Sequence, residues 1–351
     1  MLIRLSHLLP FILPVSVFFF LLSGPHSIEG ALAWTTPFWT VLLADWLSPE
    51  VTTQQQQSVK NGFYDGILYG LAVLQMVNVG LMLDYISRLE WTSSGAAIVG
   101  LANLVAVRFL VGTSSGTSGI VVAHELIHRP QWPMQQLGRL LLCSVCYEHF
   151  VITHKRGHHL NIGMPQDIAM PHLGESFHDY WKRIYTGNLR YAWRSEQDRL
   201  GLPQNPWGSL KSLHNRVLHG LLAELILVVS ITVFFGWIAA FMFLYQAFAA
   251  VRILEAVNYF QHWGLEDGRY GHSYGWVNNS WLTSYALIGL SNHIGHHQNE
   301  KKHFYEIAYS DQGPKMPYGY FIMNLWVKLN NDSYQKMAMR ELQHYRCSQR
   351  S

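Results

Sequence analysis

The segment His154 to His159 reads HKRGHH, and the rest of the chain is organised around it. It holds three histidines in six residues. In a helix, His154 and His158 would stand one turn apart on one face, with His159 beside them. Several imidazole nitrogens could then reach one point, which is what a metal site requires.

Three other segments repeat this arrangement. His124 and His128 stand four residues apart in HELIH, His262 lies in NYFQHWGL, and residues 292–297 read NHIGHH. Spacings of three and four residues place imidazoles on one face of a helix, pointing the same way. The sequence therefore predicts nine metal ligands: His124, His128, His154, His158, His159, His262, His293, His296 and His297.

The composition is that of a membrane protein. Of the 351 residues, 49% are apolar and only 13% are charged, whereas an ordinary soluble domain carries about 25% charged residues. The net charge of +3 is small and dispersed, which argues against a nucleic-acid-binding protein. Three cysteines do not make a disulfide framework.

Six apolar segments predict an all-α integral membrane protein. The expected transmembrane helices cover residues 8–22, 31–47, 62–86, 95–123, 217–235 and 237–257. The first could be a signal peptide, but no small-x-small cleavage site follows it, so a membrane helix is the preferred interpretation. The apolar patches at 135–152, 282–290 and 321–327 are short, and they predict buried, re-entrant or interfacial helices.

The positive charges predict the orientation. Of the 25 Lys and Arg residues, 11 lie at 124–216 and 10 lie from Arg252 onward. By the positive-inside rule, regions 124–216 and 258–351 should form one histidine-rich cap on the cytoplasmic side. The sequence has no internal repeat, so we expect residues 1–351 to form a single domain. We expect this domain to lie in the inner membrane of a bacterium.

Nine histidines exceed what one metal ion binds, so two metal ions are expected. Neutral imidazole suits zinc, copper, iron and nickel, and ligand type alone does not separate them. A two-metal site with only nitrogen ligands, beside a membrane, favours a redox metal. Iron that oxidises an apolar substrate with dioxygen is the preferred interpretation.

Two other functional classes fit part of the pattern. HELIH is also an HExxH motif, in which Glu125 would be the general base of a zinc protease in the membrane. Such a protease needs the two histidines of the motif and one more ligand, so six of the nine histidines would have no role. A metal transporter should carry ionisable residues inside its spans. Arg108 does lie within a predicted span, but the nine histidines cluster outside the spans.

The order of the four histidine motifs resembles that of the membrane-bound di-iron alkane hydroxylases and the related xylene monooxygenases, in the fatty acid desaturase-like superfamily. The resemblance covers about residues 123–320, and NYFQHWGL distinguishes the hydroxylases from ordinary desaturases. It implies two non-haem iron ions held by the nine histidines, with no catalytic residue beyond these ligands. It also implies hydroxylation of the terminal methyl group of an alkane or similar hydrophobic substrate.

Departures from the family pattern leave the substrate open. Thr153 stands where alkane hydroxylases usually carry Glu, and Asn292 and Gly295 replace the usual Arg and Asp of the last motif. The following HFYEI is closer to the xylene-type enzymes. A fatty acyl desaturase or an alkene-forming fatty acid decarboxylase with the same metal site remains the alternative.

The reaction needs electrons from elsewhere. The chain has neither a GxGxxG fingerprint nor a cysteine set for an iron-sulfur centre. The resemblance implies rubredoxin or ferredoxin with an NAD(P)H-dependent reductase. Five basic residues could dock an acidic donor, or could simply follow the positive-inside rule: Arg129, Lys155, Arg156, Lys182 and Arg183.

Carboxylates near the motifs could orient the imidazoles. A metal-bound histidine usually donates its other ring N–H to such a group. The candidates are Glu125, Asp167, Glu255 and Asp267. The remaining nearby histidines are expected to be solvated or to support the ligands: His149, His172, His272 and His303.

Overall fold

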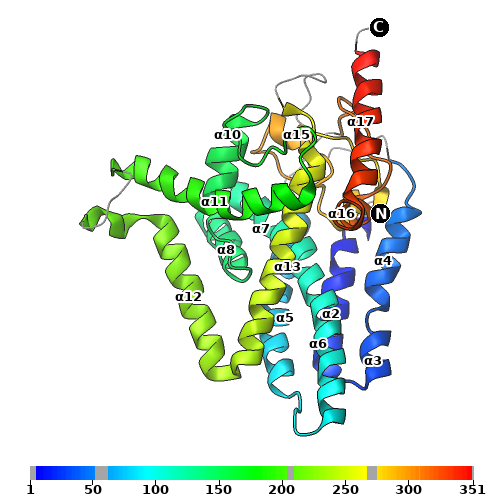
Figure 1. Ribbon diagram of the computed structural model, residues 1–351, viewed down its shortest axis with the longest axis vertical. Coiled ribbons are helices and arrows are strands. Elements are labelled where there is room, and N and C mark those ends of the chain that lie inside the picture. The colour runs from blue at the N-terminus through cyan, green and yellow to red at the C-terminus, as the bar shows by residue number, and fades with distance from the viewer. Residues whose placement is uncertain (1–4, 52–61, 204–208, 267–274, 308, 350–351) are drawn as a thin grey trace.

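The computed structural model describes residues 5–51, 62–203, 209–266, 275–307 and 309–349. Within these ranges the chain is almost entirely helical, and its strand-like pairings are the isolated bridges Glu50–Ser280 and Val277–Lys315. Figure 1 shows long helices running along the molecule, with most of the shorter helices gathered at one end. The prediction of an all-helical fold class is therefore confirmed for the described residues.

Among the described residues, four helices are long and apolar enough to cross a membrane. They are α5 (Gly62–Ser87), the continuous helix Ser94–His128, α12 (Arg216–Phe235) and α13 (Trp237–His262). Each corresponds to one of the predicted spans. The turn predicted near Gly236 separates α12 from α13, and this glycine has a φ of +87°, a backbone conformation that side chains disfavour.

The first two predicted spans form shorter helices. Residues 8–22 give a 3₁₀ turn, Leu9–Phe11, followed by α2 (Ile12–Ser23). Residues 31–47 are divided between α3 (Ile28–Ala33) and α4 (Thr36–Trp46), which starts afresh with Pro37 in its first turn. Because α2 packs against α5 and α6 (Ser94–Ser114), and α3 against α6, both segments belong to the same helical bundle.

The helix Ser94–His128 carries the first histidine motif at its end. It comprises α6 (Ser94–Ser114), a π-helical turn at Ser115–Ile120, and α7 (Val121–His128). Small residues along it let α13 approach closely. A Cβ added at Gly112 would lie 3.2 Å from that of Ala249, and one added at Gly116 would lie 3.0 Å from that of Ile253.

The remaining helices build the histidine-bearing end of the molecule. The segments predicted to be short buried or interfacial helices are confirmed as helical, and α8 packs along α7. The helices are α8 (Trp132–Cys143), α9 (Phe150–Ile152), a π-helical turn at Thr153–His158, α10 (His159–Asn161), α11 (Phe177–Leu200), a 3₁₀ turn at Leu210–His214, α14 (Trp281–Ala286), α15 (His293–Gln298), α16 (Tyr320–Leu329) and α17 (Asn331–Ser348).

Candidate metal centre

The structure brings all nine predicted histidines together in two neighbouring groups. Within each group the potential ligand nitrogens all lie within 4.8 Å of one another. The first group holds His124, His128, His154, His159 and His296, and the second holds His158, His262, His293 and His297.

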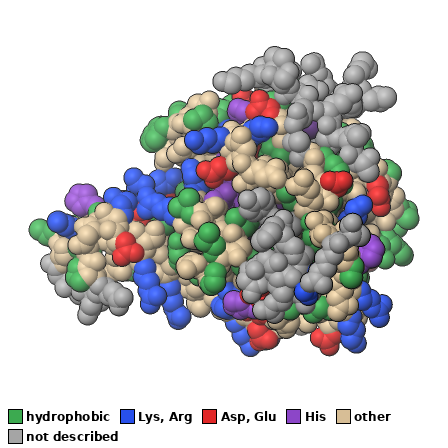
Figure 2. All heavy atoms as spheres, turned by 90° about the horizontal axis from the view of Figure 1, so that it is seen from above, with side chains coloured by type: hydrophobic (Ala, Val, Ile, Leu, Met, Phe, Trp, Pro, Cys, Tyr) green, Lys and Arg blue, Asp and Glu red, His purple; other side chains and the backbone are tan. Residues whose placement is uncertain are grey.

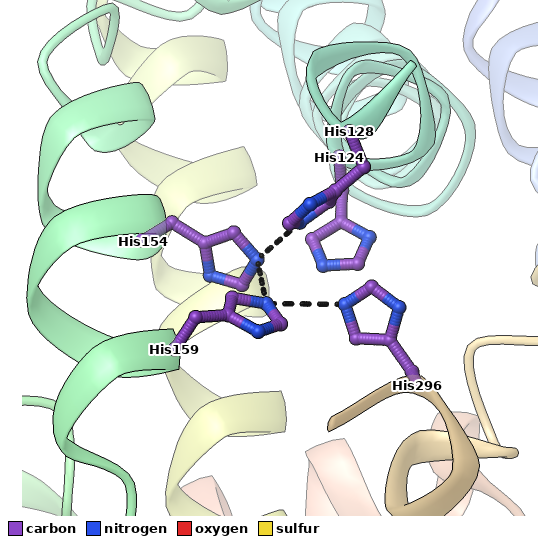
Figure 3. A group of neighbouring side chains, drawn as sticks. All are labelled: His124, His128, His154, His159 and His296. Carbon is purple, nitrogen blue, oxygen red and sulfur yellow. Dashed lines mark hydrogen bonds between the residues drawn. The ribbon is translucent and has the colours of Figure 1, made fainter. Parts of the chain in front are cut away.

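In the first group, side chains from three parts of the chain surround one point (Figure 3). The Nε2 atom of His154 lies 3.0 Å from that of His128 and 3.0 Å from that of His159. The Nε2 atom of His296 lies 3.2 Å from that of His159. Five imidazole nitrogens are therefore available to a single ion.

The second group is as compact as the first. The Nε2 atom of His293 lies 2.8 Å from that of His262 and 2.9 Å from that of His297. The Nε2 atom of His158 lies 3.2 Å from that of His297. Four imidazoles from three parts of the chain thus converge beside the first group.

The local helix geometry decides which histidines share a group. His154 and His158 belong to different groups, whereas the sequence suggested that their imidazoles could reach one point. Residues 153–158 form a π-helical turn and not an ordinary α-helix. A π-helix closes its hydrogen bonds from i to i+5, and His154 is accordingly grouped with His159. In the ordinary α-helix α7, His124 and His128 do share a group, as their spacing predicted.

The short helix α15 bridges the two groups. His293 and His297, one turn apart, face the second group, while His296 faces the first. The three histidines of this motif, predicted to lie on one face, are therefore divided between two neighbouring groups. Because neighbouring histidines point to different groups, this six-residue helix contributes imidazoles to both groups.

Burial keeps these imidazoles neutral. Burial, followed by the proximity of other histidines, lowers the pKa of His154, His293, His296 and His297 well below the usual value. The same two causes lower the pKa of His159 to about 2. A neutral imidazole keeps a lone pair for a metal, so the donor set fits transition-metal ions that accept nitrogen.

Two carboxylates lie against the outer nitrogens of the histidines. The Nδ1 atom of His158 donates to Oδ2 of Asp167 at 2.7 Å, and Asp167 is fully buried. In the first group, Oε2 of Glu300 lies 3.5 Å from Nδ1 of His128 and 3.3 Å from Nδ1 of His159. Asp167 was among the predicted candidates, whereas Glu300 was missed because it follows its motif within a charged NEKK run.

The other predicted carboxylates have different partners. Glu125 forms an ion pair with Arg129 at 2.9 Å and accepts from the backbone N–H of Phe304 at 3.1 Å. Glu255 is fully buried and accepts from the hydroxyls of Tyr147 and Tyr180. Both support the fold around the histidines. Asp267 lies outside the described residues.

The remaining nearby histidines do not join either group. His149 is buried beside the Tyr147 ring, and burial lowers its pKa to about 4. His172 is exposed and donates through Nδ1 to Glu266, and His303 stacks on Tyr305. His272 lies outside the described residues.

Comparison with known proteins places the site in a family. Residues 100–312 match the fatty acid desaturase family. Alkane 1-monooxygenase 1 of Pseudomonas aeruginosa is 34% identical over 288 residues, which is 78% of this chain and 71% of that protein. Alkane 1-monooxygenase 2 of the same organism is 31% identical over 78% of this chain and 72% of its own length. The xylene/toluene monooxygenase hydroxylase component XylM of Pseudomonas putida is 27% identical over 71% of this chain and 64% of its length.

Proposed function

Because the chain belongs to the fatty acid desaturase family and, within it, to the alkane 1-monooxygenases, we propose that it hydroxylates the terminal methyl group of a hydrophobic substrate at a two-iron site. It is a membrane oxidoreductase that depends on dioxygen. The observation that carries the proposal is the convergence of nine imidazoles in adjoining groups of five and four. That number fits two ions and exceeds the needs of one.

The nine histidines would hold the iron, and the surrounding residues would keep it oriented and dry. When bound, two iron ions supply the activation of dioxygen for oxidation of an unactivated C–H bond. Asp167 fixes the tautomer of His158 by accepting its Nδ1 proton. Beside His124, a cavity of about 10 Å³ is walled partly by Ile288, Leu290 and Phe304, which limits the access of water.

The position of Glu125 argues against the zinc protease alternative. A general base needs a carboxylate that can reach a metal-bound water. Here the Glu125 carboxylate is held by Arg129 and by a backbone N–H, and HELIH supplies only two of the nine clustered histidines. The monooxygenase accounts for all nine.

We further infer that six segments cross the membrane, with the histidine-bearing end toward the cytoplasm. The four long helices would be joined by α2, which packs against α5 and α6, and by the pair α3 and α4, of which α3 packs against α6 and α4 against α2. The concentration of Lys and Arg at 124–216 and from Arg252 onward supports this orientation.

A separate protein would deliver the electrons, with rubredoxin or ferredoxin and its reductase as the expected donors. Three of the predicted docking residues are engaged within the chain: Arg129 is buried against Glu125, Arg156 pairs with Glu196, and Arg183 pairs with Glu175. In the view onto the histidine-bearing end, Lys and Arg side chains gather toward the α11 side (Figure 2). The exposed cations of α11 that form no ion pair with the described residues supply a more accessible surface for an acidic donor: Lys182, Arg190 and Arg194.

Metal analysis of the purified, detergent-solubilised protein tests the proposal. We expect close to two irons per chain, a Mössbauer signature of paired non-haem iron after iron-57 enrichment, and a terminal alcohol from octane when a donor system is added. One zinc ion per chain, with no iron, would overturn the proposal and favour the protease.

Two histidine variants sharpen this test. His158→Ala removes a buried imidazole of the second group, and we expect loss of both hydroxylation and iron. The matched control, His172→Ala, removes an exposed imidazole outside both groups, and both properties should persist. Survival of iron and activity in His158→Ala would show that the assignment of ligands is wrong.

A further inference from the structure

A second, larger cavity lies between α4, α6, α13 and α16. It has a volume of about 530 Å³, within the usual range for a small-molecule site. Most of its lining is apolar or aromatic, and two of its lining residues, Trp39 and Leu329, are 53% and 79% exposed. The cavity therefore opens on the surface that we assign to lipid.

Three cations from three different helices line this cavity. They are Arg108 of α6, Arg252 of α13 and Lys328 of α16, and no acidic residue lines it. None of the three forms an ion pair with the described residues. Unpaired cations are costly in and beside the membrane, and where they occur they usually serve a function.

Two of the three cations, Lys328 and Arg108, are held in place by their surroundings. Lys328 donates through Nζ to Oδ1 of Asn324 at 2.5 Å, and the amide of Asn324 donates to the backbone carbonyl of Ile253 at 3.0 Å. The guanidinium of Arg108 lies 5.8 Å from the centre of the Tyr245 ring. A fixed arrangement of this kind suits the recognition of one anion.

The three like charges also disfavour one another. Burial, followed by the nearness of Arg252 and Arg108, lowers the pKa of Lys328 to about 7. A bound anion would remove this repulsion and supply the missing hydrogen-bond acceptors. The cavity is therefore electrostatically incomplete without a negatively charged group.

The cavity leads from the cations toward the metal centre. Arg252 and His262 lie on the same helix, ten residues apart, which corresponds to about 15 Å of helical rise. The lining residues Thr117 and Val257 lie between the cations and the histidines along α6–α7 and α13, and Leu287 adjoins Ile288 in the wall of the small cavity beside His124. The inner end thus faces the histidines and the outer end holds the cations.

We propose that this cavity binds a long-chain carboxylate, with its anionic head on Arg108, Arg252 and Lys328 and its apolar tail directed to the metal centre. The volume suits one acyl chain better than the two chains of a phospholipid. The binding of the carboxylate does not depend on the proposed function. Its consequence does rest on that function: the end of the chain remote from the carboxylate is oxidised.

Binding to the protein in zwitterionic lipid nanodiscs tests the site without turnover. We expect saturable binding of dodecanoate, at least about tenfold tighter than that of dodecanol, because only the carboxylate meets the cations. Arg252→Gln and Lys328→Met should each weaken dodecanoate binding by about tenfold or more. The matched control, Lys336→Met, removes an exposed cation of α17 outside the cavity and should leave it unchanged.

Two results would overturn the proposal. Equal affinity for dodecanoate and dodecanol, unaffected by either substitution, would show that no carboxylate site exists. Competition for the cavity by phosphatidylglycerol without any binding of dodecanoate would show that the cations hold a bilayer headgroup instead. Because the iron content is measured separately, a protein that lacks iron but binds dodecanoate would contradict the proposed function and leave this site standing.

The products of turnover test the direction of binding. With dodecanoate, oxidation at the far end should give the terminal hydroxy acid. Formation of a terminal alkene with loss of the carboxyl group would place the carboxylate at the metal centre, and it would refute the proposed direction.

Discussion

Replacing Asp167 by Asn should weaken the metal site formed by the second group of histidines. The buried Oδ2 of Asp167 accepts from Nδ1 of His158 at 2.7 Å, and its Oδ1 accepts from the backbone N–H of Ala169 at 2.9 Å. Asn can keep the second bond through its carbonyl oxygen. Its amide then faces Nδ1 of His158, so the carboxylate that fixes the tautomer is lost.

The size of the effect follows from the role of such carboxylates. Loss of a group that orients a ligand histidine usually lowers metal affinity by about 10- to 100-fold, which corresponds to about 1.4 to 2.8 kcal/mol. Because the first group holds five histidines and does not contact Asp167, we expect one of the two irons to be affected more than the other.

A chelator challenge measures this difference. Wild-type protein and Asp167→Asn are incubated with a graded series of chelator concentrations, and retained iron is measured by mass spectrometry. We expect the variant to lose about one iron per chain under conditions in which the wild type keeps both. Glu300→Gln serves as the matched variant, because Glu300 lies against His128 and His159 of the first group.

Mössbauer spectra of the two variants identify which iron is lost. Loss of the same iron in both would contradict the assignment of the carboxylates to separate groups. Full retention of two irons by Asp167→Asn, at wild-type chelator resistance, would refute the reasoning for Asp167. A thermal melt separates this effect from general unfolding.

Two further predictions concern the helix contact and the cation cluster. Gly116→Leu should lower the free energy of unfolding by about 1–3 kcal/mol, because a Cβ there would lie 3.0 Å from Ile253. A thermal melt in detergent measures this loss. The control is Gly80→Leu, which should be nearly neutral because Gly80 faces open space. The affinity for dodecanoate should fall as the pH rises above about 7, since the pKa of Lys328 is about 7 and only the protonated amine attracts a carboxylate. The fixed charges of Arg108 and Arg252 should preserve weaker binding, and Lys328→Met should abolish the pH dependence.

The clustering of the nine histidines could be predicted because their spacing is visible in the sequence. All nine predicted histidines lie in the two groups. Their division between the groups could not be predicted, since it depends on a π-helical turn at Thr153–His158 that an assumed period of 3.6 residues misses. In α15, which is an ordinary α-helix, the spacing of His293, His296 and His297 likewise does not indicate which group each one joins.

The span pattern was predicted where a helix is long and uninterrupted. The segment at 31–47 is apolar throughout, yet it is divided between two helices, with a proline in the first turn of the second. The cation cluster of the larger cavity was harder to predict from the sequence. Arg252 lies within an apolar stretch of more than forty residues, and only the packing of α6, α13 and α16 shows that it shares a cavity with Arg108 and Lys328.

The two sites are linked by helix register. Arg108 and His124 lie sixteen residues apart on the continuous helix Ser94–His128, about 24 Å of helical rise, while Arg252 and His262 are separated by about 15 Å on α13. The close contacts at Gly112 and Gly116 hold these helices against each other. The distance along the helices between the cations and the histidines therefore cannot change unless that packing is broken. A carboxylate anchored at the cations would therefore meet the metal centre with a fixed length of chain. Chain-length selectivity should then respond to substitutions at the inner wall, such as Val257→Phe, more than to changes in the histidine motifs.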